Sequence, residues 1–325
     1  VNAGTLSLAG GLAIANTGAV VLANVAGVTL NLAASETIGS LAGGGTTGGN
    51  VTLNASALTT GDASNPSFAG VMSGTGALIK QGTGTFTLSG VNTYSGGTTI
   101  KAGTVSGTVG AAFGTGAITI GDSSGAVAAT LSGGATHTNA ISVAAGNTGV
   151  ASITSSANSI FSGAVTLNNH DLRLAPAASN LTLSGGVTGT GNLTLASSGA
   201  GVVTLSTTSV NNAGTITNSG TGAGAALISA AVGANVTAIT ENSATSALTV
   251  SGALTVNGAG TTLTNSNASG AALLTVSGGI AGTGNLVLNN NSAIANGITL
   301  SGAGTVNNAG TVTNSGTGAG AALIC

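Results

Sequence analysis

Apolar and small polar residues alternate with a period of two in many short runs along the chain. Thr or Ser usually fills the place between two apolar residues, as in a β-strand that buries one face. Gly-Gly, Ser-Gly and Gly-Thr-Gly between the runs supply the positive φ angles that tight turns need. We therefore expect short strands joined by turns and no helix longer than about two turns. The clearest apolar pairs are Leu6 and Leu8, Leu30 and Leu32, Phe86 and Leu88, Ile118 and Ile120, Leu181 and Leu183, Leu193 and Leu195, Leu254 and Val256, Leu286 and Leu288, and Ile298 and Leu300.

The chain also repeats itself over longer distances. The stretch from Asn211 to Ile228 returns from Asn307 to Ile324 with one change, Ile216 to Val312, and a looser copy begins at Asn257. The three copies start 46 and 50 residues apart. A three-stranded solenoid coil takes ~20–25 residues, so each spacing corresponds to about two coils.

Short strands without helices also suit a sandwich or a propeller, whose blades take about 40–45 residues. Large aromatic residues are nearly absent, however, and Asn and Thr are plentiful enough to form ladders between stacked strands. The sequence therefore predicts an all-β fold, a parallel β-solenoid, as a single domain over residues 1–325.

Composition narrows the range of partners. The 325 residues include 3 basic and 5 acidic side chains, 58 Gly and a net charge of −2. Nucleic acids and anionic membranes require clustered Lys and Arg, so neither is an expected partner. With so few charges, we expect the charged side chains to be dispensable for folding.

The ends of the sequence carry three further observations. Residues 1–35 are too often interrupted by Asn, Thr and Gly to form a membrane-spanning helix, so no membrane insertion is expected. The first residue is Val1 and no basic stretch precedes it, so a leader has been removed or the chain is a segment of a longer one. The single cysteine, Cys325, allows no intrachain disulfide, and it marks either a chain end or an intermolecular link.

One segment resembles a known family. The segment from Gly70 to Gly103 reads GVMSGTGALIKQGTGTFTLSGVNTYSGGTTIKAG, with Lys80 between two Gly-Thr-Gly triplets and Asn92-Thr93-Tyr94 near its end. It resembles the autotransporter-associated β-strand repeat of bacterial type V passenger domains. The resemblance implies a right-handed parallel β-helix displayed or released outside a Gram-negative cell. It implies no catalytic residues.

A nucleophilic serine is the first candidate for chemistry. Gly121-Asp122-Ser123-Ser124-Gly125 fits the G-x-S-x-G pattern, and His137 or His170 would be the base. A true elbow lies between a strand and a helix. No helix is expected here, so we interpret the segment as a turn in which Asp122 accepts hydrogen bonds from its own turn amides.

The densest polar cluster runs from Asn168 to Arg173. It is either a small recognition patch or, as we expect, an exposed turn with a surface pair between Asp171 and Arg173. Two distant histidines and a terminal cysteine do not have zinc-site spacing, and no Walker loop is present. The sequence therefore predicts no catalytic, cofactor-binding or metal-binding residues.

The acidic side chains and the glycosylation sequons are spread along the chain. Sugar-cleaving enzymes need paired carboxylates or a base with charged partners, whereas Glu36, Asp62, Asp122, Asp171 and Glu241 lie one to a region. A polysaccharide-acting enzyme is therefore not expected. A face rich in Asn, Ser and Thr could still bind or carry sugar. The nominal acceptors are Asn50, Asn54, Asn180, Asn192, Asn235 and Asn267.

Two functions remain. The first is a non-enzymatic extracellular structural protein that assembles head-to-tail into filaments, because neither end of the repeat shows a cap. The second is an adhesin stalk that binds host or biofilm ligands. Expected partners are copies of the same chain, surface glycans and other matrix proteins. Replacing Leu6 and Leu8, in the first coil, with Lys should leave the fold intact and block polymerisation.

Overall fold

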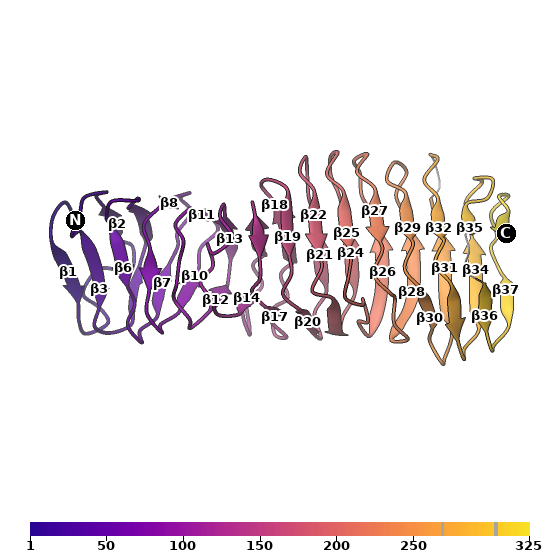
Figure 1. Cartoon of the computed structure of the whole chain (residues 1–325), viewed down its shortest axis with the longest axis horizontal. Coiled ribbons are helices and arrows are strands. Elements are labelled where there is room, and N and C mark those ends of the chain that lie inside the picture. Colours follow the sequence, from indigo (N-terminus) through magenta and orange to yellow (C-terminus); the bar gives the residue numbers. More distant parts are fainter. Residues whose placement is uncertain (268–269, 302–304) are drawn as a thin grey trace. The chain divides into compact units, whose positions relative to one another are not determined.

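The computed structural model describes residues 1–267, 270–301 and 305–325 (Figure 1). Every regular element in these residues is a β-strand, and the pairings within each sheet are parallel. The expected all-β, parallel β-solenoid is confirmed. Within the same residues, no helix exists that could cross a membrane.

The chain forms two compact units. Unit 1 comprises Val1–Ser152 and Ser156–Phe161, and unit 2 comprises Ile153–Ser155 and Ser162–Cys325. Each unit is a stack of parallel coils, and each is described by itself below. The single domain over residues 1–325 stays a prediction.

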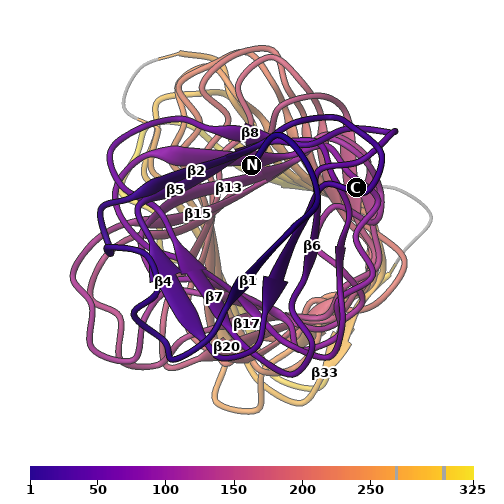
Figure 2. The same cartoon turned by 90° about the vertical axis from the view of Figure 1, so that its left-hand side faces the viewer.

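Unit 1 places its strands in three long ladders and one short one. Seen along the stacking direction, β1 and β6, β4 and β7, and β2 and β5 lie on different sides of the coil (Figure 2). The first ladder contains β1 (Thr5–Leu8), β3 (Thr29–Leu32), β6 (Asn50–Thr52) and β9 (Met72–Ser73). The second contains β4 (Glu36–Ile38), β7 (Leu58–Thr60), β10 (Leu78–Lys80), β12 (Thr98–Ile100), β14 (Ile118–Ile120) and β17 (Ile141–Val143). The third contains β2 (Ala19–Leu22), β5 (Ser40–Gly43), β8 (Ser67–Phe68), β11 (Thr85–Leu88), β13 (Gly103–Gly107) and β15 (Ala129–Gly133), and the short one pairs β16 (Thr136–His137) with β19 (Ser159–Phe161).

Unit 2 has the same construction. Its longest ladder contains β21 (Leu172–Leu174), β24 (Leu193–Leu195), β26 (Gly214–Asn218), β28 (Val236–Glu241), β31 (Thr261–Asn265), β34 (Leu286–Asn290) and β37 (Val312–Asn314). A second contains β22 (Leu181–Leu183), β25 (Val203–Leu205), β27 (Ala226–Ile228), β29 (Leu248–Val250), β32 (Leu274–Val276), β35 (Ile298–Leu300) and β38 (Ala322–Ile324). The remaining strands are β20 (Val165–Asn168) with β23 (Val187–Thr190), and β30 (Leu254–Val256) with β33 (Ile280–Gly282) and β36 (Val306–Asn308). The strand β18 (Ala151–Ser155) contributes residues to both units.

The register of neighbouring strands gives the length of a coil. In unit 1, Leu78 pairs with Thr98, so one coil takes 20 residues. In unit 2, Leu248 pairs with Leu274, so one coil takes 26. The first and second copies of the repeated segment supply β26 and β31, which are two coils apart, and the third supplies β37, two coils further on. The expected two coils per repeat spacing are confirmed.

Alternating side chains fill the interior of the coils. Within β11, β14 and β22 the apolar residues are buried, while the Thr residues between them are partly exposed. Full burial of one such apolar side chain contributes roughly 1.5–3 kcal/mol. Leu6 differs from the other inward residues because it lies on the outermost strand β1, where it is 37% exposed, whereas Leu8 is buried. A Lys at Leu8 would therefore disturb the core, contrary to the expectation from sequence.

Close stacking also explains part of the glycine content. Gly43 has φ of 88°, and a Cβ built on it would lie 2.2 Å from the backbone oxygen of Leu22 in the neighbouring coil. A larger residue would be strained by its φ and would also collide with that carbonyl. Glycine at this position is therefore set by the spacing between coils.

Candidate functional site

We call the segment from Gly70 to Gly103 the family-like segment. Four of its polar side chains, Lys80, Asn92, Tyr94 and Thr98, are buried inside the coils. Lys80 is 1% exposed, although the sequence suggested a dispensable charge. Its Nζ donates to the backbone oxygens of Gln81 at 2.6 Å, Gly82 at 2.8 Å and Ala102 at 3.3 Å. Burial lowers the pKa of Lys80 to about 8, and the nearby Asp62 opposes that shift. Lys80 thus ties its own turn to the turn of the next coil.

Asn92 makes a similar connection in two directions. Its Oδ1 accepts from the backbone N–H of Met72 at 2.7 Å, and its Nδ2 donates to the backbone oxygen of Ala112 at 2.6 Å. These partners lie 20 residues before and 20 residues after Asn92, on the preceding and the following coil. A carboxamide can do this because it carries both donors and an acceptor.

Tyr94 and Thr98 complete the segment. The hydroxyls of Tyr94 and Thr98 are 2.6 Å apart, and Thr98 Oγ1 also donates to the backbone oxygen of Phe113 at 3.2 Å. Both side chains are buried, and burial raises the pKa of Tyr94. The polar residues of the family-like segment therefore have structural roles within the stack.

His137 also lies inside unit 1. Its ring packs between those of Phe113 and Phe161, with centroid distances of 4.7 and 5.0 Å, and its Nδ1 is 3.1 Å from the backbone oxygen of Gly110. Burial lowers the pKa of His137, so the neutral ring is favoured. The side chain of Ser123, in contrast, is exposed, and its backbone N–H donates to Asp122 Oδ1 at 2.7 Å. This geometry confirms the turn interpretation of the G-x-S-x-G segment.

Two of the five carboxylates are buried. Glu36 is 2% exposed, and its two carboxylate oxygens accept from the backbone N–H groups of Ala13 at 3.2 Å and Ile14 at 2.8 Å. Glu241 is 0% exposed. Glu36, Lys80 and Glu241 are thus buried and hydrogen-bonded to neighbouring groups, which speaks against the expectation that the scarce charged side chains are dispensable for folding.

Glu241 belongs to a column of four side chains inside unit 2, which we call the inner polar column. The register places Asn218 beside Glu241, Glu241 beside Asn265, and Asn265 beside Asn290. In each member, a side-chain oxygen accepts from the backbone N–H two residues later, at distances of 2.6 to 3.3 Å. In addition, Asn218 Nδ2 donates to Glu241 Oε2 at 2.8 Å. Polar side chains are thus stacked in register inside the coils, and the hydrogen bond between Asn218 and Glu241 joins two neighbouring members of the column.

The outside of the same sheet carries a second column, which we call the outer threonine row. Thr194, Thr217, Thr240 and Thr264 are register partners on four successive strands, and Asn289 follows them. All are partly exposed. Within the described part of unit 2, no protein group forms a hydrogen bond with the four hydroxyls. Strands pair ~4.8 Å apart, so the row presents hydroxyl and methyl groups at that interval.

A shallow groove on unit 1 is also lined in part by threonine side chains, like the outer threonine row of unit 2. Its volume is about 250 Å³, and it is lined by Thr83, Gly103, Thr104, Val127, Ala128 and Thr130.

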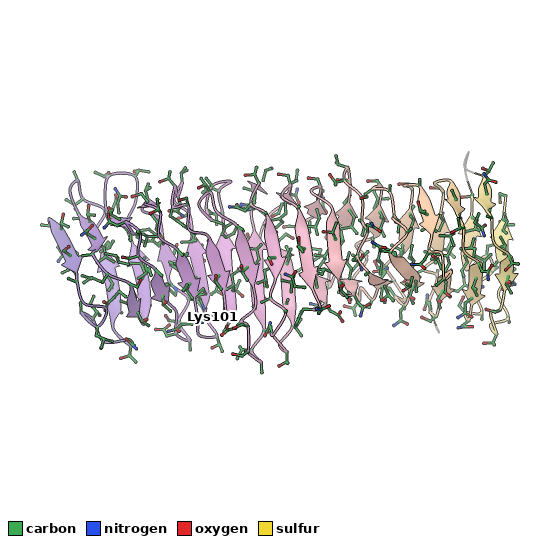
Figure 3. The ribbon with its side chains drawn as sticks, turned by 90° about the horizontal axis from the view of Figure 1, so that it is seen from below. Lys101 is labelled. Carbon is green, nitrogen blue, oxygen red and sulfur yellow. The ribbon has the colours of Figure 1, made fainter. Side chains whose placement is uncertain are left out.

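Lys101, whose side chain is labelled in Figure 3, forms an ion pair with Asp122 across 3.7 Å on the surface. The side chains of this pair are 42% and 28% exposed, and such pairs add little stability.

The polar cluster from Asn168 to Arg173 differs from the expected pair. Asp171 accepts from the backbone N–H of Asn192 at 2.8 Å and from its Nδ2 at 3.3 Å. Within the described ranges, Asp171 and Arg173 form no ion pair. The expected surface pair is wrong because the carboxylate reaches the next coil, which offers it a backbone donor.

Four of the nominal glycosylation acceptors use their side chains within the protein. Asn50, Asn180 and Asn192 each accept a backbone N–H from the next coil, and Asn54 donates to the preceding coil. Asn235 is exposed. The sixth site begins at the buried Asn267, and its residues 268 and 269 lie outside the described residues. Three or more metal-ligating side chains do not gather anywhere in the described ranges.

A family model and a curated relative each match part of this chain. The family of the Passenger-associated-transport-repeat matches residues 78–106, which include Lys80, Asn92, Tyr94 and Thr98. A stretch of 107 residues is 42% identical to the Adhesin BmaC autotransporter of Brucella suis biovar 1 (strain 1330), and it covers 32% of this chain and 3% of that protein. The chain thus spans a small part of its relative's length, and no solved structure matches it. The chain carries a passenger-associated transport repeat and resembles the passenger of an autotransporter adhesin.

Proposed function

We propose that this chain is a non-enzymatic part of a passenger displayed on the surface of a Gram-negative cell, and that its outer face makes adhesive contacts. The outer threonine row carries this proposal. Its uncharged hydroxyls point outward at regular intervals, and the described protein offers them no partner. The inward Lys80 and Glu241, in contrast, form hydrogen bonds with groups of neighbouring coils.

The chemistry of the row favours one class of ligand. Hydroxyl groups both donate and accept hydrogen bonds, and the threonine methyl groups add small apolar contacts. The described residues of β24, β26, β28 and β31 present no charged side chain on the outer face. A neutral glycan or another uncharged matrix surface fits such a face better than an anionic polymer does. The similarity to a protein named as an adhesin supports the same function.

The proposal is tested by displaying the chain on a non-adherent Gram-negative host and counting the cells that remain on surfaces coated with neutral glycans. Replacing Thr194, Thr217, Thr240 and Thr264 together with Val keeps the β-branched shape and removes the hydroxyls. We expect the displayed wild type to adhere and this variant to lose most of the adherence.

The matched control makes the same change to Val at four threonines of the second ladder of unit 2. These are Thr182, Thr204, Thr249 and Thr275, on β22, β25, β29 and β32. Circular dichroism and surface labelling must show that both variants fold and are displayed equally. Adherence that is equal in the two variants, or absent from the wild type, would contradict the assignment to the outer threonine row.

Head-to-tail association of copies into filaments is a second proposal. Leu6 lies on β1, the edge strand of its ladder, and it is an inward residue with 37% exposure. Leu6→Lys alone is the suitable variant, since Leu8 belongs to the core. Light scattering of the purified chain should show concentration-dependent growth that Leu6→Lys abolishes. A wild type that remains monomeric at high concentration would reject the filament.

A further inference from the structure

Glu241 is isolated from every other ionisable side chain of its region. Between Arg173 and Cys325 the sequence contains no other Asp, Glu, Lys, Arg, His or Tyr. This carboxyl group is nevertheless 0% exposed. A charge that is buried without a partner of opposite sign is strongly unfavourable, and such a group usually becomes neutral instead.

The surroundings of Glu241 are polar but neutral. Asn218 on β26 and Asn265 on β31 are its register partners, and Ser243 follows it in the turn. Ser246 accepts from Asn218 in the same cluster, and the backbone of Leu248 on β29 also faces the carboxyl group. In the described residues of these strands and turns, no titratable or charged side chain faces Glu241.

Two opposing effects act on the proton of this carboxyl group. The donors Asn218 Nδ2 at 2.8 Å and Ser243 N–H at 2.6 Å favour the carboxylate. Removal from water disfavours it, and no cation compensates for that loss. Burial is the larger effect, and it raises the pKa of Glu241 to about 7. The other three members of the inner polar column are carboxamides, which are neutral at every pH.

We propose that Glu241 is a proton-sensitive member of the inner polar column, which makes unit 2 more stable in mild acid than at alkaline pH. The folded coil holds the proton more tightly than the unfolded chain does. Stability is therefore greatest at low pH, and it falls as the pH rises from about 4.5 through about 7. The carboxylate that forms above this range has to remain charged among neutral groups or loosen the coils around it.

The protonation state can be measured directly, because the chain contains only two glutamates, Glu36 and Glu241. Labelling glutamate with ¹³C at Cδ gives two carboxyl signals in the nuclear magnetic resonance spectrum, and Glu241→Gln assigns them. We expect the Glu241 signal to titrate well above the ordinary glutamate range. A Glu241 signal that titrates at or below about 4.5 would overturn the proposal.

The effect on stability needs a second arm. Hydrogen exchange of the strands β26, β28 and β31, corrected for the intrinsic rate, reports local opening at each pH. For the wild type we expect opening to become on the order of 100-fold more frequent between pH 5 and pH 8. Glu241→Gln keeps the shape and polarity of the side chain and should remove that dependence.

A swapped variant, Glu241→Gln with Asn242→Glu, provides the matched control. Asn242 is exposed, so the swap moves the carboxyl group by one residue from the interior to the surface without changing the net charge. Its opening should be nearly independent of pH over the same range. If the swapped variant keeps the wild-type dependence, the effect does not come from the buried position of Glu241. If Glu241→Gln fails to fold, Glu36→Gln assigns the two signals instead, and the titration of the labelled wild type still decides the proposal.

Discussion

The side chain of Asn92 donates from Nδ2 to the backbone oxygen of Ala112 across 2.6 Å, and it thereby joins one coil of unit 1 to the next. Its Oδ1 accepts from Met72 on the coil before, so a single carboxamide spans three coils. All of this lies in the interior, where water cannot replace a lost partner. The family-like segment is therefore best understood as a set of internal connections.

Asn92→Ala should lower the free energy of unfolding of unit 1 by about 2–4 kcal/mol, because it leaves a buried N–H and a buried C=O unpaired. Thr93→Ala, at the exposed neighbouring position, serves as the control and should change stability by less than about 0.5 kcal/mol. Denaturant unfolding monitored by circular dichroism measures both. Equal effects of the two substitutions would contradict the role assigned to Asn92.

Lys80 and Lys101 provide a second matched pair. Lys80→Met removes the donor to three backbone oxygens and should destabilise unit 1 by about 1–3 kcal/mol. Lys101→Met removes an exposed ion pair and should cost about 0–1 kcal/mol. Thermal unfolding at pH 7 compares them. A Lys80→Met variant as stable as the wild type would show that the ammonium group is not needed in the stack.

The buried His137 should make unit 1 sensitive to acid. Because burial lowers its pKa in the folded state, the unfolded chain takes up a proton first as the pH falls below about 6.5, and stability is lost from that point downward. His137→Phe keeps an aromatic ring between Phe113 and Phe161 and should weaken this loss. Melting temperatures measured at pH 7.5 and pH 5.5 test it. An unchanged difference between the two pH values in the variant would assign the acid sensitivity to other groups.

Much of the fold could be predicted from sequence, because strand alternation and coil length are local properties. The pairs Leu181 with Leu183 and Leu193 with Leu195 are buried as expected. The interior polar groups were harder to predict from the sequence. Glu241 lies two residues after the buried Ile239 on the same strand. Residues two apart on a strand face the same side, so the alternation alone would place Glu241 inside. Its charge was expected to be dispensable, and only the stacking shows that Asn218 and Asn265 flank it. The partner of Asp171 was missed for a similar reason, since Asn192 belongs to the next coil.

The alternation itself can be tested with one adjacent pair. Leu183 is buried on β22, whereas Thr182 beside it is partly exposed. Leu183→Asp places a carboxylate in the core and should cost several kcal/mol, which is enough to prevent unit 2 from folding. Thr182→Asp should leave the fold intact. Far-UV circular dichroism distinguishes the two, and a folded Leu183→Asp variant would contradict the inward assignment of this strand.

The central claim is that successive coils lie in parallel register and align the outer threonine row, and disulfide formation between adjacent positions of that row tests it most directly. In a chain with Cys325→Ser, the substitutions Thr217→Cys and Thr240→Cys place two thiols on register partners ~4.8 Å apart, within the Cα separation that a disulfide bridges. Thr217→Cys with Thr264→Cys separates them by two coils, about 9.6 Å, which is too far. Mass spectrometry of the oxidised, digested monomers should find the bond in the first pair and not in the second. No bond in the first pair, or equal bonding in both, would contradict the stacked register.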